Sequence, residues 1–205
     1  MTASWRIWAE AAALAAAAGL APAALTAQAA DLPPAGLGTL RQDAVAVRLT
    51  TGNLAVRALP LDEHVIRLLS PDTYSALHQL YQSRAAEIVA AARAEGRDSA
   101  LAFMVTFFAL QPQVNFNPDQ LYLASQNNFY RPIGIIPLTP RWSEYRIDQR
   151  QQASAIYLFD PVIPVLQPFT LFYGDISSDA WESSIHLLAG ERARVLARAA
   201  QRSQP

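Results

Sequence analysis

The sequence contains no cysteine. This excludes disulfide bonds, and it also excludes the cysteine to which a bacterial lipoprotein attaches its lipid. The chain has 205 residues, of which 52% are hydrophobic and 16% charged, a balance typical of a globular protein. We therefore expect one domain that buries a sizeable core and is stable without covalent cross-links.

Lysine is also absent, so the 16 basic residues are all arginine, and with 17 acidic residues the net charge is -1. Nucleic acid is not expected as a partner, because the phosphate backbone favours proteins with a dense excess of basic side chains. Arginine forms planar, bidentate pairs that lysine cannot form, which would suit the capture of carboxylates or phosphates. The chain is also rich in alanine and proline, so we interpret the arginine bias as compositional.

Glycine and histidine are sparse, which argues against cofactor and metal chemistry. The 8 glycines are scattered and form no nucleotide-binding loop. The 3 histidines, His64, His78 and His186, lack the close spacing of a zinc site. We therefore expect no cofactor and no metal. The densest polar cluster, Asp62-Glu63-His64, could supply one side of a metal site, but we interpret it as a solvated loop between a strand and a helix.

The N-terminal segment is typical of a secretory signal peptide. An apolar, alanine-rich run at 11–25 follows Arg6 and precedes the small-residue sequence Ala27-Gln28-Ala29. The run is shorter than the roughly 20 residues that a membrane-spanning helix needs, although Glu10 is unusual in a signal peptide. We predict that residues 1–29 are removed, that the protein is exported to the periplasm or the extracellular medium, and that the mature chain has no integral membrane span.

The mature chain is predicted to consist of a linker at 30–43 and a single domain at 44–205. The sequence 33–38 contains two prolines and two glycines, which are typical of a linker. The domain then begins with a β-hairpin, because apolar residues alternate on both sides of a polar turn near position 52.

The register of this hairpin depends on the position of its loop. A loop at Gly52-Asn53 would set Arg48 directly opposite Arg57, and like charges across a strand pair are unfavourable. We therefore favour a loop at Thr51-Gly52, which pairs valine with valine and leucine with leucine.

Two helices are predicted within the domain. The first, at about 71–95, begins with Ser70-Pro71-Asp72, which places proline at the first helical position and an acid in the first turn. Gly96 predicts its end. The second helix, at about 179–201, has an apolar stripe that begins with Trp181.

The other predicted elements are short strands separated by proline-rich turns. The run 101–110 is apolar at nearly every position, which is typical of a strand buried on both faces, with a short buried helix as the alternative. Alternating residues predict strands at 120–124 and 169–173, and an apolar run predicts one at 153–159. About seven strands predict a mainly β fold, α+β by content: an antiparallel immunoglobulin-like β-sandwich with one inserted and one C-terminal helix. The cysteine and tryptophan landmarks of antibody domains are absent, so this expectation concerns architecture alone.

Residues 127–142, NNFYRPIGIIPLTPRW, are apolar and aromatic but contain three prolines. Each proline removes a backbone donor, so we expect this segment to pair at a sheet edge or to cross irregularly between strands. In one interpretation the prolines protect an edge from aggregation, while Phe129 and the isoleucines cover the core. In the other, the segment contributes a binding surface made of residue types that dominate binding hot spots. Its four candidate residues are Tyr130, Arg131, Arg141 and Trp142.

These observations favour an exported, non-enzymatic interaction or structural module of a bacterial-type cell envelope, whose partner is an envelope protein or an acidic polymer. One alternative is a small exported hydrolase or metal-dependent enzyme that uses His64, His186 or the aspartates. It predicts a pocket in which a histidine meets a carboxylate. A further alternative is a β-sandwich that binds a small ligand in a cavity lined by its tyrosines and phenylalanines.

Overall fold

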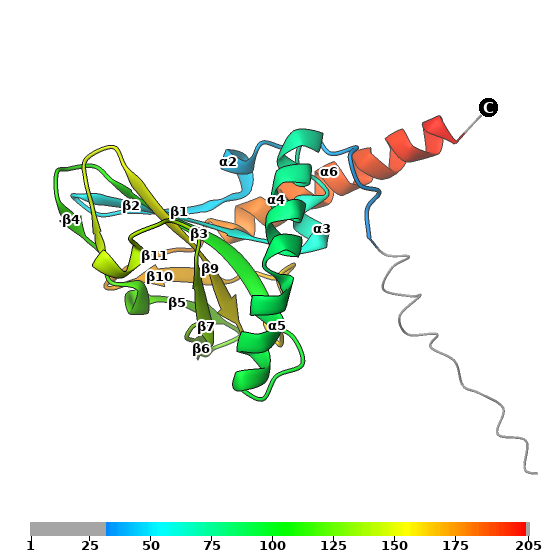
Figure 1. The fold of residues 1–205 in the computed structure, drawn as a ribbon. Helices are drawn as coiled ribbons and strands as arrows, with labels where there is room; N and C mark the ends of the chain where they lie inside the picture. The colour runs from blue at the N-terminus through cyan, green and yellow to red at the C-terminus, as the bar shows by residue number, and fades with distance from the viewer. Residues whose placement is uncertain (1–31, 204–205) are drawn as a thin grey trace, which may run out of the picture. The chain divides into compact units, whose positions relative to one another are not determined.

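The computed structural model describes residues 32–203, and the predicted signal peptide at 1–29 lies outside them. Within the described residues the chain is mainly antiparallel β-sheet with a long C-terminal helix, as Figure 1 shows. Three sheets occur in this range, with five, four and two strands. The predicted mainly β character and the predicted C-terminal helix are therefore confirmed.

The larger sheet holds strands β1, β2, β3, β9 and β7 in that order, and each neighbouring pair is antiparallel. Their bounds are Val47–Thr50 for β1, Leu54–Pro60 for β2, Leu101–Ala109 for β3, Gln152–Phe159 for β9 and Gly134–Pro137 for β7. The central strand β3 is buried along most of its length. The apolar run at 101–110 thus forms a strand, as predicted, and not a buried helix.

The second sheet holds β11, β10, β5 and β6 in that order, again antiparallel throughout, and β4 pairs with β8 in the small sheet. Their bounds are Val114–Asn115 for β4, Leu121–Ser125 for β5, Asn128–Tyr130 for β6, Arg146–Ile147 for β8, Thr170–Tyr173 for β10 and Ile176–Ser178 for β11. The predicted strands near 120–124 and 169–173 are β5 and β10. Strands β4, β8 and β11 were missed, because segments of two or three residues are too short to show alternation.

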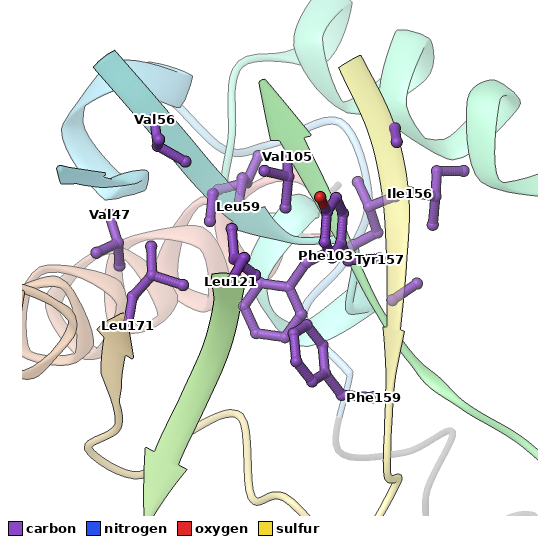
Figure 2. Close-up of a cluster of buried hydrophobic side chains, with 14 of the residues drawn as sticks. Val47, Val56, Leu59, Phe103, Val105, Leu121, Ile156, Tyr157, Phe159 and Leu171 are labelled. Carbon is purple, nitrogen blue, oxygen red and sulfur yellow. The ribbon is translucent and has the colours of Figure 1, made fainter. Parts of the chain in front are cut away.

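The core lies between the two larger sheets, which face each other. The ring centroids of Phe103 and Phe169 are 5.6 Å apart, and those of Phe107 and Tyr173 are 5.5 Å apart, so each pair joins the two sides. Figure 2 shows Leu121 of the four-stranded sheet among the buried side chains of the five-stranded sheet. This packing fixes which face of each strand is internal, and therefore which face is left on the surface.

Five helices lie among the described residues. Their bounds are Gln42–Val45 for α2, Glu63–Ile66 for α3, Pro71–Ser83 for α4, Ala85–Ala94 for α5 and Trp181–Arg202 for α6, and two short 3-10 helices, η1 and η2, span Pro118–Gln120 and Trp142–Glu144. The single helix predicted at 71–95 is in fact two, because the backbone of Arg84 leaves helical geometry with φ −110° and ψ 4°. Gly96 ends α5 with φ +69°, as predicted.

The register of the first hairpin corrects the sequence prediction. Arg48 is paired with Arg57, so the loop is at Gly52-Asn53 and not at Thr51-Gly52. The pairing is tolerated because Asp43 contacts both guanidinium groups, with N···O distances of 3.0 Å to Arg48 and 2.6 Å to Arg57. A carboxylate from outside the hairpin therefore offsets the repulsion on which the prediction was based.

The segment predicted as a linker at 30–43 is packed against the domain from residue 33 onward. Leu40 forms a parallel bridge with Leu69, and its N–H donates to the carbonyl of Leu68 at 3.1 Å. Gly38 lies so close to Leu68 that an added Cβ would be 2.3 Å from the Leu68 carbonyl carbon. The glycine that suggested a flexible linker is thus required by close packing.

The segment 127–142 contributes an edge to each of the two larger sheets. Strand β6 is the outer strand of the four-stranded sheet, and β7 is the outer strand of the five-stranded sheet. The predicted edge position of this proline-rich segment is therefore confirmed. Phe129, however, does not cover the core: 73% of it is exposed, because it pairs with Ala124 on the outward face of its sheet.

Candidate functional site

An aromatic cluster with one exposed ring and two half-buried rings lies on the outer face of the four-stranded sheet. It consists of Tyr122 on β5, Phe129 on β6 and Phe172 on β10, and we call it the aromatic platform. The rings of Tyr122 and Phe172 stack with centroids 4.7 Å apart and an interplanar angle of 6°. Phe129 meets both rings edge-on, at 6.0 Å from Tyr122 and 6.2 Å from Phe172.

Strand periodicity and register bring these three rings together. Successive side chains of a strand point to opposite faces, so the burial of Leu121, Leu123 and Leu171 in the core turns Tyr122 and Phe172 outward. Tyr122 and Phe172 are direct partners across β5 and β10. These alternating leucines were recognised in the sequence, but the large aromatic residues between them were not identified as a surface.

A depression of about 490 Å³ opens beside the platform, and Phe129 and Phe172 form part of its wall. Its polar lining comes from the ends of β5 and β10, the turn after β5 and the segment around the start of α6. The polar residues are Ser125, Gln126, Asn127, Thr170, Asp179 and Glu182. The depression therefore combines aromatic faces with hydroxyl, amide and carboxylate groups.

Several of these polar side chains are available to a ligand. Gln126 and Asn127 form the tight turn between β5 and β6 with φ values of 50° and 63°. The side-chain amide of Gln126 donates a hydrogen bond to Gln167 at 2.9 Å, so Gln126 is not one of the side chains without a partner. Asp179 and Glu182 are exposed, and neither side chain forms a hydrogen bond or ion pair within residues 32–203.

The structure places the four binding residues predicted from the sequence in different environments. Tyr130 and Arg131 follow Phe129 at the sheet edge, where Tyr130 is half-buried and Arg131 donates weakly to the Asp119 carbonyl at 3.5 Å. Arg141 is exposed and paired with Glu144 at 2.6 Å. Their roles in binding stay predictions.

Trp142 is a core residue and not a surface residue. Only 7% of it is exposed, and its ring packs on Phe116 and Phe107 with centroids 5.0 Å and 5.9 Å away. Among the described residues, no hydrogen bond, ion pair or ring contact joins the pair 130–131 to the pair 141–142. The burial of Trp142 removes it from the surface cluster predicted from the sequence.

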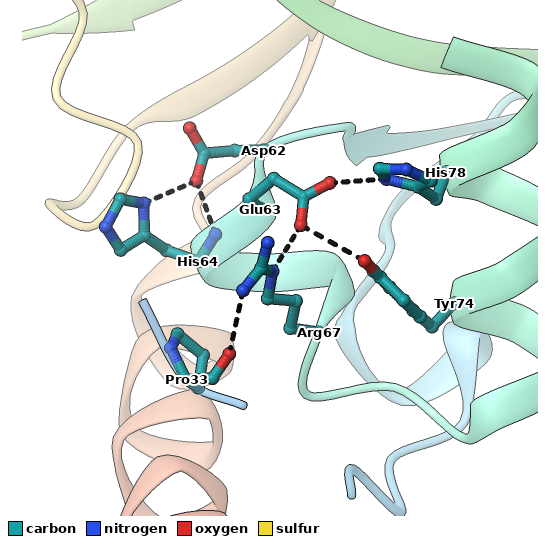
Figure 3. Close-up of polar contacts among 7 residues, drawn as sticks. All are labelled: Pro33, Asp62, Glu63, His64, Arg67, Tyr74 and His78. Atoms are coloured by element: carbon teal, nitrogen blue, oxygen red, sulfur yellow. Dashed lines mark hydrogen bonds and ion pairs between the residues drawn. The ribbon is translucent and has the colours of Figure 1, made fainter. Parts of the chain in front are cut away.

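A second polar site lies where α3 meets α4 (Figure 3). Glu63 accepts hydrogen bonds from Arg67 and from Tyr74, the latter at 3.5 Å, and its Oε1 lies 2.7 Å from His78 Nδ1. Burial alone would raise the pKa of Glu63, but its contacts with Arg67 and His78 outweigh burial and lower that pKa below its ordinary value. The predicted solvated loop at 62–64 is thus partly the short helix α3, whose Glu63 joins α3 to α4.

Two histidines of this second site have the contacts on which a catalytic or metal-binding role would depend. His64 Nδ1 lies 2.9 Å from Asp62, which also accepts the backbone N–H of His64 and so begins α3. His64 also lines a small, mostly apolar depression of about 170 Å³, so a histidine does meet a carboxylate beside a pocket. In residues 32–203, neither His64 nor His78 shares a hydrogen bond with a hydroxyl group, and no group of three or more histidines and acids could hold a metal ion. His186 is exposed on α6.

The comparisons with known proteins add no further constraint: no family model, no curated protein and no solved structure matches the chain. Among the helices of the described residues, none is long and apolar enough to cross a membrane. The aromatic platform with its adjoining depression is therefore the candidate site, on geometry alone.

Proposed function

We propose that this protein is an exported, non-enzymatic interaction module of a bacterial-type cell envelope, and that it binds its partner through the aromatic platform. Export to the periplasm or the extracellular medium rests on the signal-like sequence of residues 1–29. The binding role rests chiefly on one observation, which is that Phe129 is 73% exposed within a cluster of three aromatic rings.

The physical argument is that the Phe129 ring gains free energy when a partner buries it. Burying a phenylalanine contributes roughly 1.5–3 kcal/mol, and this stabilisation is largely absent while the ring faces water. Scattered exposed apolar residues are common, but adjoining aromatic rings on a rigid sheet are typical of binding surfaces. The antiparallel pairing of β5, β6 and β10 holds the rings in place, so little ordering is needed on binding.

Of the residues predicted from the sequence, Arg131 follows Phe129 by two positions, and we propose that it extends the contact at the margin of this surface. Tyr130 pairs with the buried Leu123 and packs against the core, so it faces away from the platform. We also propose that the two facing sheets are an immunoglobulin-like sandwich, a class of fold that commonly serves binding. The strand order on which this rests is β1-β2-β3-β9-β7 opposite β11-β10-β5-β6.

The experiment that tests this function is a crosslinking capture from envelope extract with the chain that starts at residue 30. Phe129→Ala should abolish or strongly weaken the capture of a partner. Phe108→Ala is the matched control, because Phe108 is also an exposed phenylalanine on a strand, at 37%, but belongs to the five-stranded sheet. Equal loss with both variants, or no loss with Phe129→Ala, would contradict a binding role for the platform.

A further inference from the structure

We propose that the depression beside the aromatic platform binds an uncharged sugar unit of a glycan. This inference rests on the proposed function, because it names the ligand class of the same surface.

The first argument is the shape and composition of the wall. The volume of about 490 Å³ falls within the roughly 300–1,000 Å³ of typical ligand sites. Phe129 and Phe172 present ring surface to this space. A pyranose ring carries hydroxyls around its edge and C–H groups on its faces, so one face can lie on an aromatic ring while the edge contacts polar groups.

The second argument is the chemistry of the polar lining. The carboxylates of Asp179 and Glu182 accept hydrogen bonds but cannot donate, and the Asn127 amide can do both. These three side chains form no hydrogen bond with any other described residue. A ligand that satisfies them must therefore offer several donors, which is what a ring of hydroxyl groups provides.

The third argument is charge. Two carboxylates and no basic residue are found among the described residues that line the depression. An anionic ligand would be repelled there, so an acidic polymer does not fit this site even if it contacts the protein elsewhere.

A basic peptide would also match the two carboxylates, but the position of the lining favours a sugar. A peptide that binds by strand addition would run along the free edge of β6. The polar lining instead comes from the turn at 126–127, from Thr170 on β10 and from the start of α6. These groups come from three separate segments, so the lining does not follow a strand edge.

The test is a calorimetric titration of the folded chain 30–205 with a tetramer of β-1,4-linked N-acetylglucosamine, which carries no charge. We expect measurable binding that Phe129→Ala weakens by about tenfold or more and that Glu182→Gln weakens several-fold, with Phe108→Ala as an unchanged control. The affinity should be nearly the same at about 50 mM and 500 mM salt, because binding of a neutral ligand is not screened.

Three outcomes would overturn the inference. No binding of the tetramer, when Phe129→Ala still abolishes capture of an envelope partner, would leave the binding role standing and remove the sugar. Binding of the tetramer that is indifferent to both Phe129→Ala and Glu182→Gln would place the sugar elsewhere. Binding of oligolysine in place of the tetramer, weakened by salt and by Glu182→Gln, would assign the site to a basic peptide. Both variants are at exposed positions, and circular dichroism of each checks that its fold is retained.

Discussion

At the scale of single residues, Glu191 shows how the segment before β1 is held to the rest of the domain. Its side chain is fully buried on α6, and it accepts hydrogen bonds from the backbone N–H of Thr39 at 2.9 Å and from the Thr39 hydroxyl at 2.8 Å. Burial would raise the pKa of Glu191, but hydrogen bonds from Thr39, Arg198 and Arg194 outweigh it and lower that pKa. A charged carboxylate can therefore remain buried at neutral pH.

Gly38, next to Thr39, gives the sharpest prediction at this scale. Gly38→Ala should destabilise the fold by about 2 kcal/mol or more, because the new Cβ would lie 2.3 Å from the Leu68 carbonyl carbon and the backbone would have to move. Urea unfolding measures the change. Gly190→Ala is the matched control: nothing lies within 4 Å of its Cβ position on α6, so it should stabilise by about 0.5–1 kcal/mol. Equal effects of the two variants would show that segment 33–43 is not packed as described.

At the scale of elements, most helices and strands could be predicted from periodicity, but their junctions could not. The break at Arg84 between α4 and α5 leaves the apolar spacing unchanged, so the sequence shows one continuous helix. The prediction of the hairpin register was wrong for a different reason. The repulsion between Arg48 and Arg57 is visible in the sequence, but the compensating Asp43 comes from a segment whose position depends on the tertiary fold.

This pairing predicts how the hairpin responds to the loss of Asp43. Asp43→Asn should lower the free energy of unfolding by no more than about 1 kcal/mol, because the group is exposed and solvent screens its charge. Arg48→Thr added to Asp43→Asn should recover stability, since one of the two facing charges is then removed. Asp98→Asn, at an exposed position, serves as the control.

The ion pairs of Asp43 with Arg48 and Arg57 make the stability of the protein depend on pH. The hydrogen bond from Arg57 is the main reason that the pKa of Asp43 lies below its ordinary value of 3.8. The contribution of the Asp43 carboxylate to folding stability is therefore present above pH 3.8 and is lost as the pH falls through the lowered pKa. The difference between the parent protein and Asp43→Asn should shrink in acid. A difference that is constant down to about pH 2 would contradict this origin.

At the scale of the whole molecule, the candidate site could not be predicted, because burial depends on which sheet face another element covers. The sequence places Phe129, Ile135 and Ile136 in one apolar segment, but the crossover carries Phe129 to one sheet and the isoleucines to the other. Helix α5 then packs beside β7, with Ala91 near Gly134, whereas Phe129 remains exposed. Composition alone does not distinguish these two environments, and it does not predict that Trp142 is buried.

The two facing sheets share one core, which predicts cooperative unfolding. Without residues 1–29, Trp142 and Trp181 are the remaining tryptophans. Trp142 packs on Phe116, whereas Trp181 stacks on Phe169 with centroids 5.0 Å apart. In Trp142→Phe and in Trp181→Phe, tryptophan fluorescence therefore reports one of these two positions. In each variant, the fluorescence transition in urea should coincide with the transition in far-ultraviolet circular dichroism.

Comparing the two signals within one variant removes the effect of the substitution on stability, since both signals come from the same protein. A fluorescence transition of Trp142 at lower urea than the circular dichroism of the same variant would mean that the packing around Phe116 and Phe107 opens first. The core would then consist of two separately stable parts. Coincident transitions in both variants would instead show that the aromatic platform rests on a sheet as stable as the molecule itself, which is what a preorganised binding surface requires.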